Sequence, residues 1–293
     1  YHPWRYFCYL YRVWYNSINN KYTRAADEFH SWLDNNIMHQ DDEGSLYIYE
    51  QQFNIGGTIY TRTGFVGLIE LQEFSKGNIL PHENTLSKPK ADRLNLMRAC
   101  NANFSQVFGL YDDEDKSISQ LIYEYKERVQ PNIQFQTEEG ITESLWKLSD
   151  AAVIDRIQKT MEAKKLFIAD GHHRYETALA YRDEQISQNP NHTGEEIYNY
   201  VMMMLVAMND PGLVVLPTHR CINNIENFNS DDFLNKVSEE FSISSYEFKS
   251  SNNDERSIEI EDRLTKSGEH SFAYYDGNGT DYYIFKLKDI SHI

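Results

Sequence analysis

Residues 164–181 read KKLFIADGHHRYETALAY, and the expected fold can be built outward from them. The run 166–169 is short and apolar, with lysines before it and Asp-Gly after it, which is typical of a buried strand. From Tyr175 onward, apolar residues recur at helical spacing. The polar residues 170–174 therefore occupy the turn between a strand and a helix.

This turn carries groups that could bind an anion and move protons. The first turn of a helix has backbone N–H groups without acceptors and the positive end of the helix dipole. His172 and His173 add proton-transfer groups, and Arg174 adds a planar pair of donors suited to phosphate or carboxylate. The simpler interpretation is that Asp170 only caps the helix and that the next residues only begin it. Both interpretations stay open at this point.

The charge of the chain argues against one class of partner. The 293 residues carry a formal net charge of −17, although the hydrophobic and charged fractions are ordinary for a globular protein. An acidic surface repels phosphate backbones, so nucleic acid is not expected as a partner. A locally basic turn can still bind a small anionic ligand, because exposed charges are screened over short distances.

The sequence also indicates a compartment. Cys8, Cys100 and Cys221 lie far apart without paired spacing, which favours a reducing compartment, and we expect a cytoplasmic protein. No apolar run is long enough to span a membrane, and the N-terminal residues lack the apolar core of a signal peptide, so no membrane partner is expected. Because the chain begins at Tyr1, we expect it to be a fragment or a processed product.

Strands and helices are expected to alternate through most of the chain, which predicts an α/β or mixed α+β fold. We expect three parts: an irregular segment over 1–20, an α/β core carrying the site over 21–220, and a smaller α+β portion over 221–293. Strands are expected at 45–53, 58–74, 104–111, 132–137, 166–169, 201–208, 214–216, 242–248, 270–275 and 282–287. Helices are expected at 21–38, 90–101, 117–129, 151–163, 230–240, 252–266 and from Tyr175 onward.

Two further polar pairs follow expected strands. His82 and Glu83 lie on a loop after the strand at 58–74, and His219 and Arg220 follow the strand at 214–216. If these pairs converge on the turn at 170–174, Glu83 could act as a general base, Asp170 could hold a divalent cation, and the cationic side chains could bind phosphate. The common glycine-rich nucleotide loops, the His-Glu-x-x-His motif and the Gly-x-Ser-x-Gly motif are absent from the sequence.

A transition-metal site on His172, His173 and His219 is the rival interpretation. Adjacent residues on a helix point about 100° apart, which makes His172 and His173 an unfavourable pair of ligands for one ion.

Several motifs in order resemble those of the bacterial and archaeal domain-of-unknown-function 1015 family. They are NILPHENTL at 78–86, KADR at 90–93, IADGHHRYETA at 168–178, DPGL at 210–213 and LPTHR at 216–220. The resemblance runs from about Lys21 to the C-terminus. Members usually begin with a Pro-Pro-Tyr-Asp segment and continue further at the C-terminus, and neither feature is present here.

More distantly, the turn at 170–174 and the Pro-His-Glu loop resemble the ParB/sulfiredoxin-like superfamily, which implies a mixed sheet core with flanking helices. Free serine kinases of that superfamily place a similar turn against nucleotide phosphates and use a loop glutamate as base. The resemblance implies Glu83 as base toward a serine hydroxyl, with Mg²⁺ and ATP or ADP as cofactors. The candidate site then comprises catalytic Glu83, Asp170 and His173, with Asp170 also as metal ligand, and phosphate-binding Gly171, His172, Arg174 and His82. His219 and Arg220 are added to the phosphate-binding groups only because they follow an expected strand.

The leading hypothesis is a nucleotide-dependent phosphotransferase acting on a small hydroxylated metabolite such as free serine. A phosphoester hydrolase acting on phosphoserine needs the same groups and is the alternative within enzymes. A non-catalytic nucleotide-binding regulatory protein is the alternative outside them.

Overall fold

A mixed eight-stranded sheet organises the first of two units in the computed structural model, which describes residues 19–83, 85, 87–215, 219–277, 279–289 and 291. The chain divides into residues 1–216 and 217–293, whereas the sequence placed a boundary after Arg220. Of the predicted irregular segment, only residues 19 and 20 lie among the described residues. The mixed α/β class is confirmed.

The order of the strands in the large sheet is β3-β7-β4-β8-β2-β1-β6-β5. The strands are β1 (Leu46–Ile55), β2 (Thr58–Glu70), β3 (Ile79–Leu80), β4 (Val107–Tyr111), β5 (Ile133–Gln136), β6 (Thr142–Leu148), β7 (Leu166–Asp170) and β8 (Tyr200–Ala207). The helices are α2 (Lys21–Asp34), α3 (Ser87–Cys100), α4 (Ser117–Lys126), α5 (Ala151–Met161) and α6 (His172–Gln188), with single turns η2 (Phe74–Lys76) and η3 (Ile197–Asn199).

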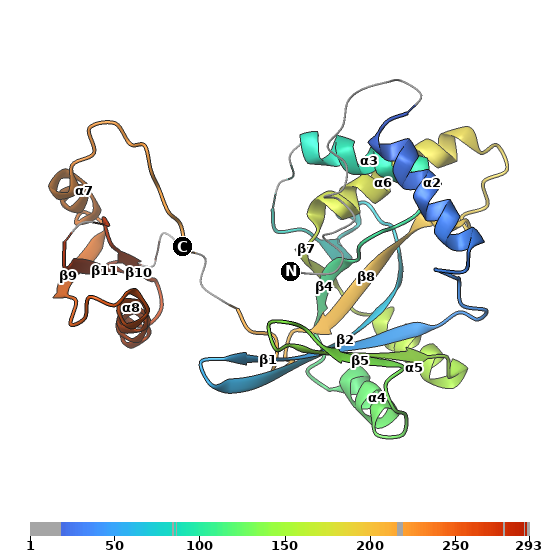
Figure 1. The fold of residues 1–293 in the computed structure, drawn as a ribbon, viewed down its shortest axis with the longest axis horizontal. Helices are drawn as coiled ribbons and strands as arrows, with labels where there is room; N and C mark the ends of the chain where they lie inside the picture. Colours follow the sequence, from blue (N-terminus) through green and yellow to red (C-terminus); the bar gives the residue numbers. More distant parts are fainter. Residues whose placement is uncertain are drawn as a thin grey trace. The chain divides into compact units, whose positions relative to one another are not determined.

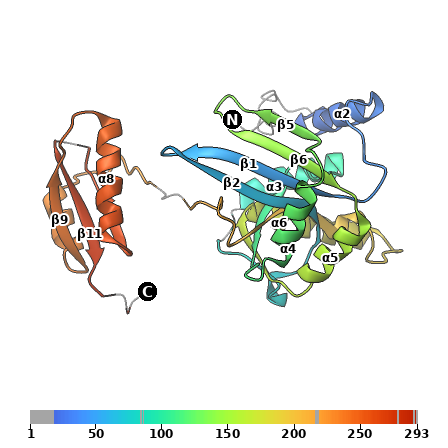
Figure 2. The ribbon, with the colours of Figure 1, turned by 90° about the horizontal axis from the view of Figure 1, so that it is seen from below.

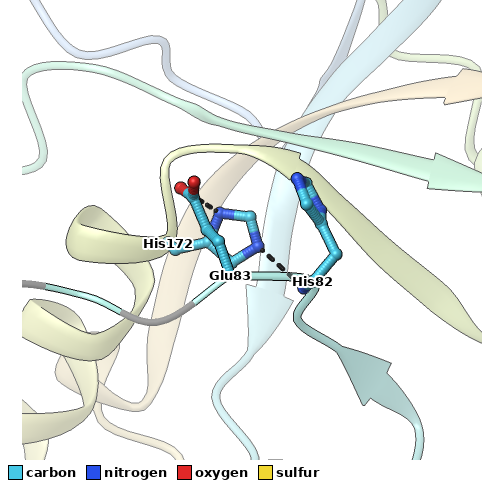
Figure 3. Close-up of side chains that lie close together, drawn as sticks. All are labelled: His82, Glu83 and His172. Carbon is cyan, nitrogen blue, oxygen red and sulfur yellow. Dashed lines mark hydrogen bonds and ion pairs between the residues drawn. The ribbon is translucent and has the colours of Figure 1, made fainter. Parts of the chain in front are cut away.

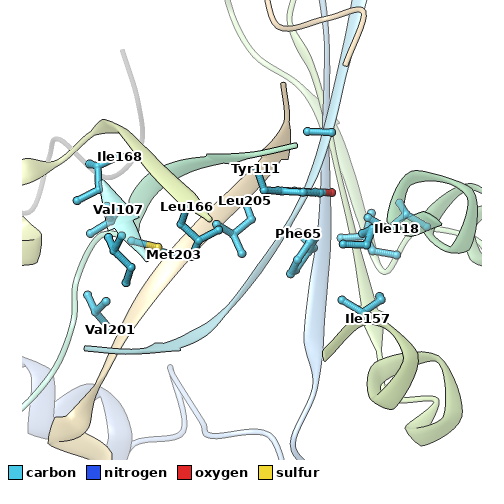
Figure 4. Packing of buried hydrophobic residues seen from close by; sticks show 14 of the residues in the cluster. Phe65, Val107, Tyr111, Ile118, Ile157, Leu166, Ile168, Val201, Met203 and Leu205 are labelled. Carbon is cyan, nitrogen blue, oxygen red and sulfur yellow. The ribbon is translucent and has the colours of Figure 1, made fainter. Parts of the chain in front are cut away.

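Helices cover the sheet on both sides. Figures 1 and 2 show α2, α3 and α6 on one side and α4 and α5 on the other. Buried residues from both layers join those of the strands in one apolar cluster (Figure 4). Ile118 and Ile157 come from α4 and α5, and Tyr175 comes from α6. Burial of this apolar surface is the main term that holds the layers together.

The strands expected at 45–53 and 58–74 form a hairpin, because β1 and β2 pair antiparallel from Ile55 and Thr58 outward, on either side of Gly56 and Gly57. Both glycines have positive φ, the backbone conformation that two-residue hairpins require and that glycine adopts at least cost.

The junction of β7 and α6 is also confirmed, with one correction. The helix begins at His172, three residues before Tyr175, and its N-cap is Gly171 with φ of 96°. Asp170 is the last residue of β7 and does not cap the helix. A Cβ atom at Gly171 would lie 2.7 Å from Nε of Arg174, so the guanidinium is folded back over this turn.

Three further elements differ from the sequence predictions. Strand β6 was not predicted, and neither was β3, whose two residues pair parallel with β7. The strand expected at 214–216 is not formed at Val214 and Val215, its described residues. Among the described residues, no helix is both long and apolar enough to cross a membrane.

The second unit is a three-stranded antiparallel sheet in the order β10-β11-β9, with a helix on each face (Figure 1). Its elements are α7 (Ser230–Val237), β9 (Phe241–Glu247), α8 (Asn253–Ser267), β10 (Ser271–Tyr274) and β11 (Asp281–Leu287). Alternate residues of β11 point to opposite faces. Tyr282 and Ile284 pack against Leu264 of α8, whereas Phe285 packs against Phe233 of α7.

Candidate functional site

The loop after β3 meets the first residue of α6 (Figure 3). The backbone N–H of His82 donates to Nε2 of His172 at 3.2 Å, and Oε1 of Glu83 lies 3.0 Å from Nδ1 of His172. The rings of His82 and His172 meet edge to face, with centroids 4.5 Å apart. Two motifs about 90 residues apart in the sequence therefore share one site.

His172 is the buried member of this cluster. The residue is 1% exposed, whereas the side chain of Glu83 is 52% exposed. His172 occupies the first position of α6, directly after the left-handed N-cap Gly171, which turns the chain from β7 into the helix. The site therefore places a solvent-facing carboxylate against a buried imidazole.

The hydrogen bond to Nε2 decides which nitrogen of His172 carries the proton. A backbone N–H can only donate, so Nε2 accepts, and the neutral ring holds its proton on Nδ1, which faces Glu83. The approach of Nδ1 to Oε1 is close but outside the direction of a hydrogen bond, and buried Nδ1 has no hydrogen-bond partner among the described residues. Catalytic hydrogen bonds are often misaligned without substrate and tighten when it binds.

Burial also keeps His172 neutral. Removal from water lowers the pKa of His172 below its ordinary value, and this outweighs the nearby charge of Glu83, which acts to raise the pKa. The charge of Asp170 acts in the same direction as that of Glu83, which places Asp170 in the electrostatic environment of the pair.

The second imidazole, His82, is fixed by the main chain. Its Nδ1 lies 2.7 Å from the carbonyl oxygen of Ile168 in β7. A carbonyl can only accept, so Nδ1 carries the proton and Nε2 of the neutral ring is left as an acceptor. His82 is exposed, so this nitrogen can interact with a ligand.

Arg174 also has a structural role, because it forms hydrogen bonds to two other parts of the sheet region. Its guanidinium donates to the carboxylate of Asp170 and to the carbonyl oxygen of Gln106, which precedes β4. Burial lowers the pKa of Arg174, and Asp170 counteracts this effect. The predicted phosphate clamp therefore also ties the end of β7 to the start of β4.

His173 lies near a different group from His172. Glu176 accepts hydrogen bonds from Thr85 and Lys90, each at 2.6 Å, and these bonds join α6 to α3 and to the loop before it. Burial acts to raise the pKa of Glu176, but Lys90, Thr85 and the charge of His173 together lower it. The two adjacent histidines thus serve separate clusters, as helix geometry predicts.

Arg93 is a residue of this region that the sequence analysis did not assign to the site. It is an exposed residue of α3 whose charge lowers the pKa of Arg174, so the two cations lie near each other. Arg93 forms no ion pair or hydrogen bond with any described residue. The signal was present in the sequence, because Arg93 ends the KADR motif at 90–93.

The remaining predicted residues, His219 and Arg220, belong to the second unit, and both are exposed. Their participation in the site stays a prediction.

The residues that could hold a metal ion differ from the predicted set. Among the described residues, His82, Glu83 and His172 offer ligand atoms within 4.8 Å of one another. Of the adjacent pair His172 and His173, only His172 belongs to this group. A set that includes His219, a residue of the second unit, stays a prediction. The hydrogen bond from His82 N–H occupies Nε2 of His172 and leaves the proton on Nδ1, which favours a carboxylate–imidazole pair over a metal-ligand set.

A sequence model of the family described as "Protein of unknown function (DUF1015)" matches residues 13–293. This match confirms the resemblance seen in the motifs. No curated protein and no solved structure matches the chain.

The lowered pKa of His172 predicts a dependence of stability on pH. In the unfolded chain a histidine binds a proton below about pH 6.5, whereas folded His172 stays neutral to lower pH. The unfolded state then binds more protons, so the free energy of unfolding falls as pH falls below that value, by up to about 1.4 kcal/mol per pH unit. Urea denaturation between about pH 7.5 and 5 measures this dependence. As the pH falls, the free energy of unfolding should decrease less in His172→Gln than in the wild type.

His30 is exposed on α2 and provides the matched control. His30→Gln should keep the wild-type dependence on pH. An unchanged slope in His172→Gln would contradict a buried neutral His172.

Proposed function

The chain belongs to the DUF1015 family, and we propose that it is a phosphotransferase that moves a phosphoryl group from ATP or ADP to a small hydroxylated metabolite such as free serine. The observation that carries this proposal is the contact between exposed Glu83 and the Nδ1 side of buried His172. A solvent-facing carboxylate held beside a neutral imidazole is suited to accept a proton from a substrate hydroxyl.

Glu83 is the proposed general base. The proton on Nδ1 of His172 gives the carboxylate a fixed neighbour, and the loop that carries Glu83 is held to α6 by the bond from His82 N–H. Because these contacts come from the main chain and a buried ring, the carboxylate need not be ordered again at each turnover.

The proposed phosphate-binding groups surround the first turn of α6. Backbone N–H groups at a helix N-terminus attract anions, and Arg93 and Arg174 add two nearby cations. His82 presents Nε2, and His173 lies on the same turn. In a strongly acidic protein, this local concentration of donors supports a site for an anionic nucleotide.

Asp170 is suited to hold Mg²⁺. Its side chain is 74% exposed, and its Oδ2 accepts from Arg174, while Oδ1 has no hydrogen-bond partner among the described residues. Carboxylate oxygens are ligands that Mg²⁺ prefers, and it usually binds through one or two of them together with substrate phosphates. When bound, Mg²⁺ would neutralise charge on the transferring phosphoryl group.

The serine hydroxyl oxygen forms a bond to the terminal phosphorus while the bond from that phosphorus to the bridging oxygen of the nucleotide breaks. The hydroxyl proton goes to Glu83, and the nucleotide leaves as ADP from ATP or as AMP from ADP. No net oxidation occurs, and positioning with charge neutralisation supplies most of the rate.

Two finer expectations remain part of the proposal. The choice of serine as acceptor and of a nucleotide as donor rests on the likeness of the turn and the loop to those of ParB/sulfiredoxin-like proteins. The two cysteines among the described residues, Cys100 and Cys221, are both free thiols, which supports a reducing compartment such as the cytoplasm.

Phosphoester hydrolysis, for example of phosphoserine, is the second candidate. The observation that favours it is the group of His82, Glu83 and His172, whose ligand atoms lie within 4.8 Å of one another. If the bond from His82 N–H to Nε2 of His172 opened, this group could hold an ion that activates water. Release of phosphate from phosphoserine without a nucleotide would support hydrolysis over transfer.

Glu83→Gln should lower kcat for phosphoserine formation by about 100-fold or more, because a general base contributes about 10²–10⁴-fold. The assay supplies the full chain with serine, MgCl₂ and either ATP or ADP and measures phosphoserine. Glu162→Gln changes an exposed glutamate after α5 and should leave kcat unchanged. The proposal fails if the wild type forms no phosphoserine with either nucleotide, or if Glu83→Gln is as active as the wild type.

Arg93→Gln should raise the KM for the nucleotide by about tenfold with little change in kcat, because a hydrogen bond to a charged group contributes about 1.5–3 kcal/mol of binding. Steady-state kinetics at varied nucleotide concentration measure both constants. Arg156→Gln on α5 removes an exposed arginine elsewhere and should leave KM unchanged. Equal KM values for Arg93→Gln and the wild type would contradict a role of Arg93 in nucleotide binding.

A further inference from the structure

A cavity of about 250 Å³ lies at the other end of the central strands from the Glu83–His172 site. Strands β4 and β8 run parallel, and the cavity is lined by Tyr111 at the C-terminal end of β4 and by Asp210 in the turn that follows β8. Strand β7 runs antiparallel to β4, so Asp170 pairs near the start of β4. The cavity and the proposed phosphoryl-transfer site are therefore separated by the length of β4.

Asp210 is a partly buried carboxylate that makes no ion pair with a described residue. Its oxygens accept from the backbone N–H groups of Gly212 at 2.8 Å and Thr63 at 3.3 Å. Burial raises the pKa of Asp210 despite these bonds and despite the charges of Arg62 and Lys126, which act to lower it. By contrast, buried Glu50 on the neighbouring strand is paired with Lys126. Because burial outweighs the bonds and charges that favour the ionised form, a ligand that places a positive charge directly against Asp210 would stabilise the ionised carboxylate further.

The turn that carries Asp210 is held rigidly. A Cβ atom at Gly212 would lie 2.3 Å from the backbone of Thr61, so only glycine allows the turn to pack this closely on β2. The carboxylate is thus presented to the cavity in one position, and binding would not require the turn to be ordered first.

Tyr111 supplies an independent observation. It is 1% exposed and lines the cavity, yet its hydroxyl donates no hydrogen bond to, and accepts none from, a described residue. The hydroxyl oxygen is not one of the enclosed side-chain atoms that lack a partner, so it opens to the cavity. There it can form a hydrogen bond to a polar atom of a ligand.

Lys116 provides a positive charge at the same cavity. It precedes α4 in a left-handed conformation, is exposed, and forms no side-chain ion pair with the residues that the structure describes. The cavity is smaller than the sites of about 300–1,000 Å³ that hold drug-sized ligands. Lys126 also lines the cavity but is paired with Glu50. The cavity therefore offers the carboxylate of Asp210 and the ammonium group of Lys116 to a ligand of metabolite size.

We propose that this cavity binds a free amino acid, with the ligand ammonium group against Asp210 and the ligand carboxylate toward Lys116 and the hydroxyl of Tyr111. The proposal does not rest on the phosphotransferase function, since no residue is shared between the two sites.

Equilibrium dialysis of the full chain tests this proposal, against an isotopically labelled mixture of the protein amino acids without serine, which is the proposed substrate of the other site. We expect about one bound amino acid per chain at saturation, identified by chromatography. Asp210→Asn keeps an acceptor for the turn but loses the charge, and Lys116→Gln loses the opposite charge. Each should weaken binding of the identified amino acid by about tenfold or more.

Tyr111→Phe is the variant that separates binding from folding. Because the hydroxyl has no partner within the described residues, its removal should leave the thermal unfolding temperature unchanged while weakening binding severalfold. Glu83→Gln should bind the amino acid as the wild type does. The proposal is overturned if no amino acid binds, if binding survives Asp210→Asn and Tyr111→Phe, or if Glu83→Gln abolishes it, which would assign the ligand to the other site.

Discussion

The candidate site depends on one hydrogen bond, from the backbone N–H of His82 to Nε2 of buried His172. This bond fixes the proton of the neutral ring on Nδ1, the nitrogen that faces Glu83. It also attaches the loop that carries Glu83 to the first turn of α6. A donor that belongs to the main chain cannot change its protonation, so the arrangement holds wherever the ring stays neutral. Burial of His172 extends that range toward lower pH.

The sheet topology explains why these residues meet. Strand β3 has two residues, and its parallel pairing with the start of β7 sets the direction in which the chain leaves Leu80. His82 then reaches Ile168 in β7, and Glu83 reaches the start of α6. On the other flank, Glu176 accepts from Thr85 and Lys90, and Arg174 joins Asp170 to Gln106. Residues that in the sequence looked like ligand-binding groups thus also hold the frame of the site, and Arg93 remains as the cation without a described partner.

Local patterns predicted the elements that are decided locally. The apolar run at 166–169, the Gly56–Gly57 turn and the helix after Gly171 each carry their own signal, and the structure contains all three. The two-residue strand β3 is too short to show a periodic pattern. It forms through its pairing with a strand more than 80 residues later, which is a tertiary contact that the local sequence does not indicate. Strand β6 was not predicted because polar residues interrupt its apolar positions. Two of these polar residues, Glu143 and Ser144, are nevertheless buried. The partners of Arg174 and the neighbourhood of Arg93 likewise depend on packing between segments distant in the sequence.

The two sites differ in what they offer a ligand. At one end of β4 are helix N–H groups, cations and a base, and at the other are the carboxylate of Asp210, the hydroxyl of Tyr111 and the ammonium group of Lys116. The claim on which the first depends is the protonation of His172. NMR spectroscopy of the chain with ¹⁵N-labelled histidine, with His172→Gln used for assignment, measures it directly. At about pH 7 we predict a neutral ring protonated on Nδ1. A ring protonated on Nε2, or on both nitrogens, would contradict the account.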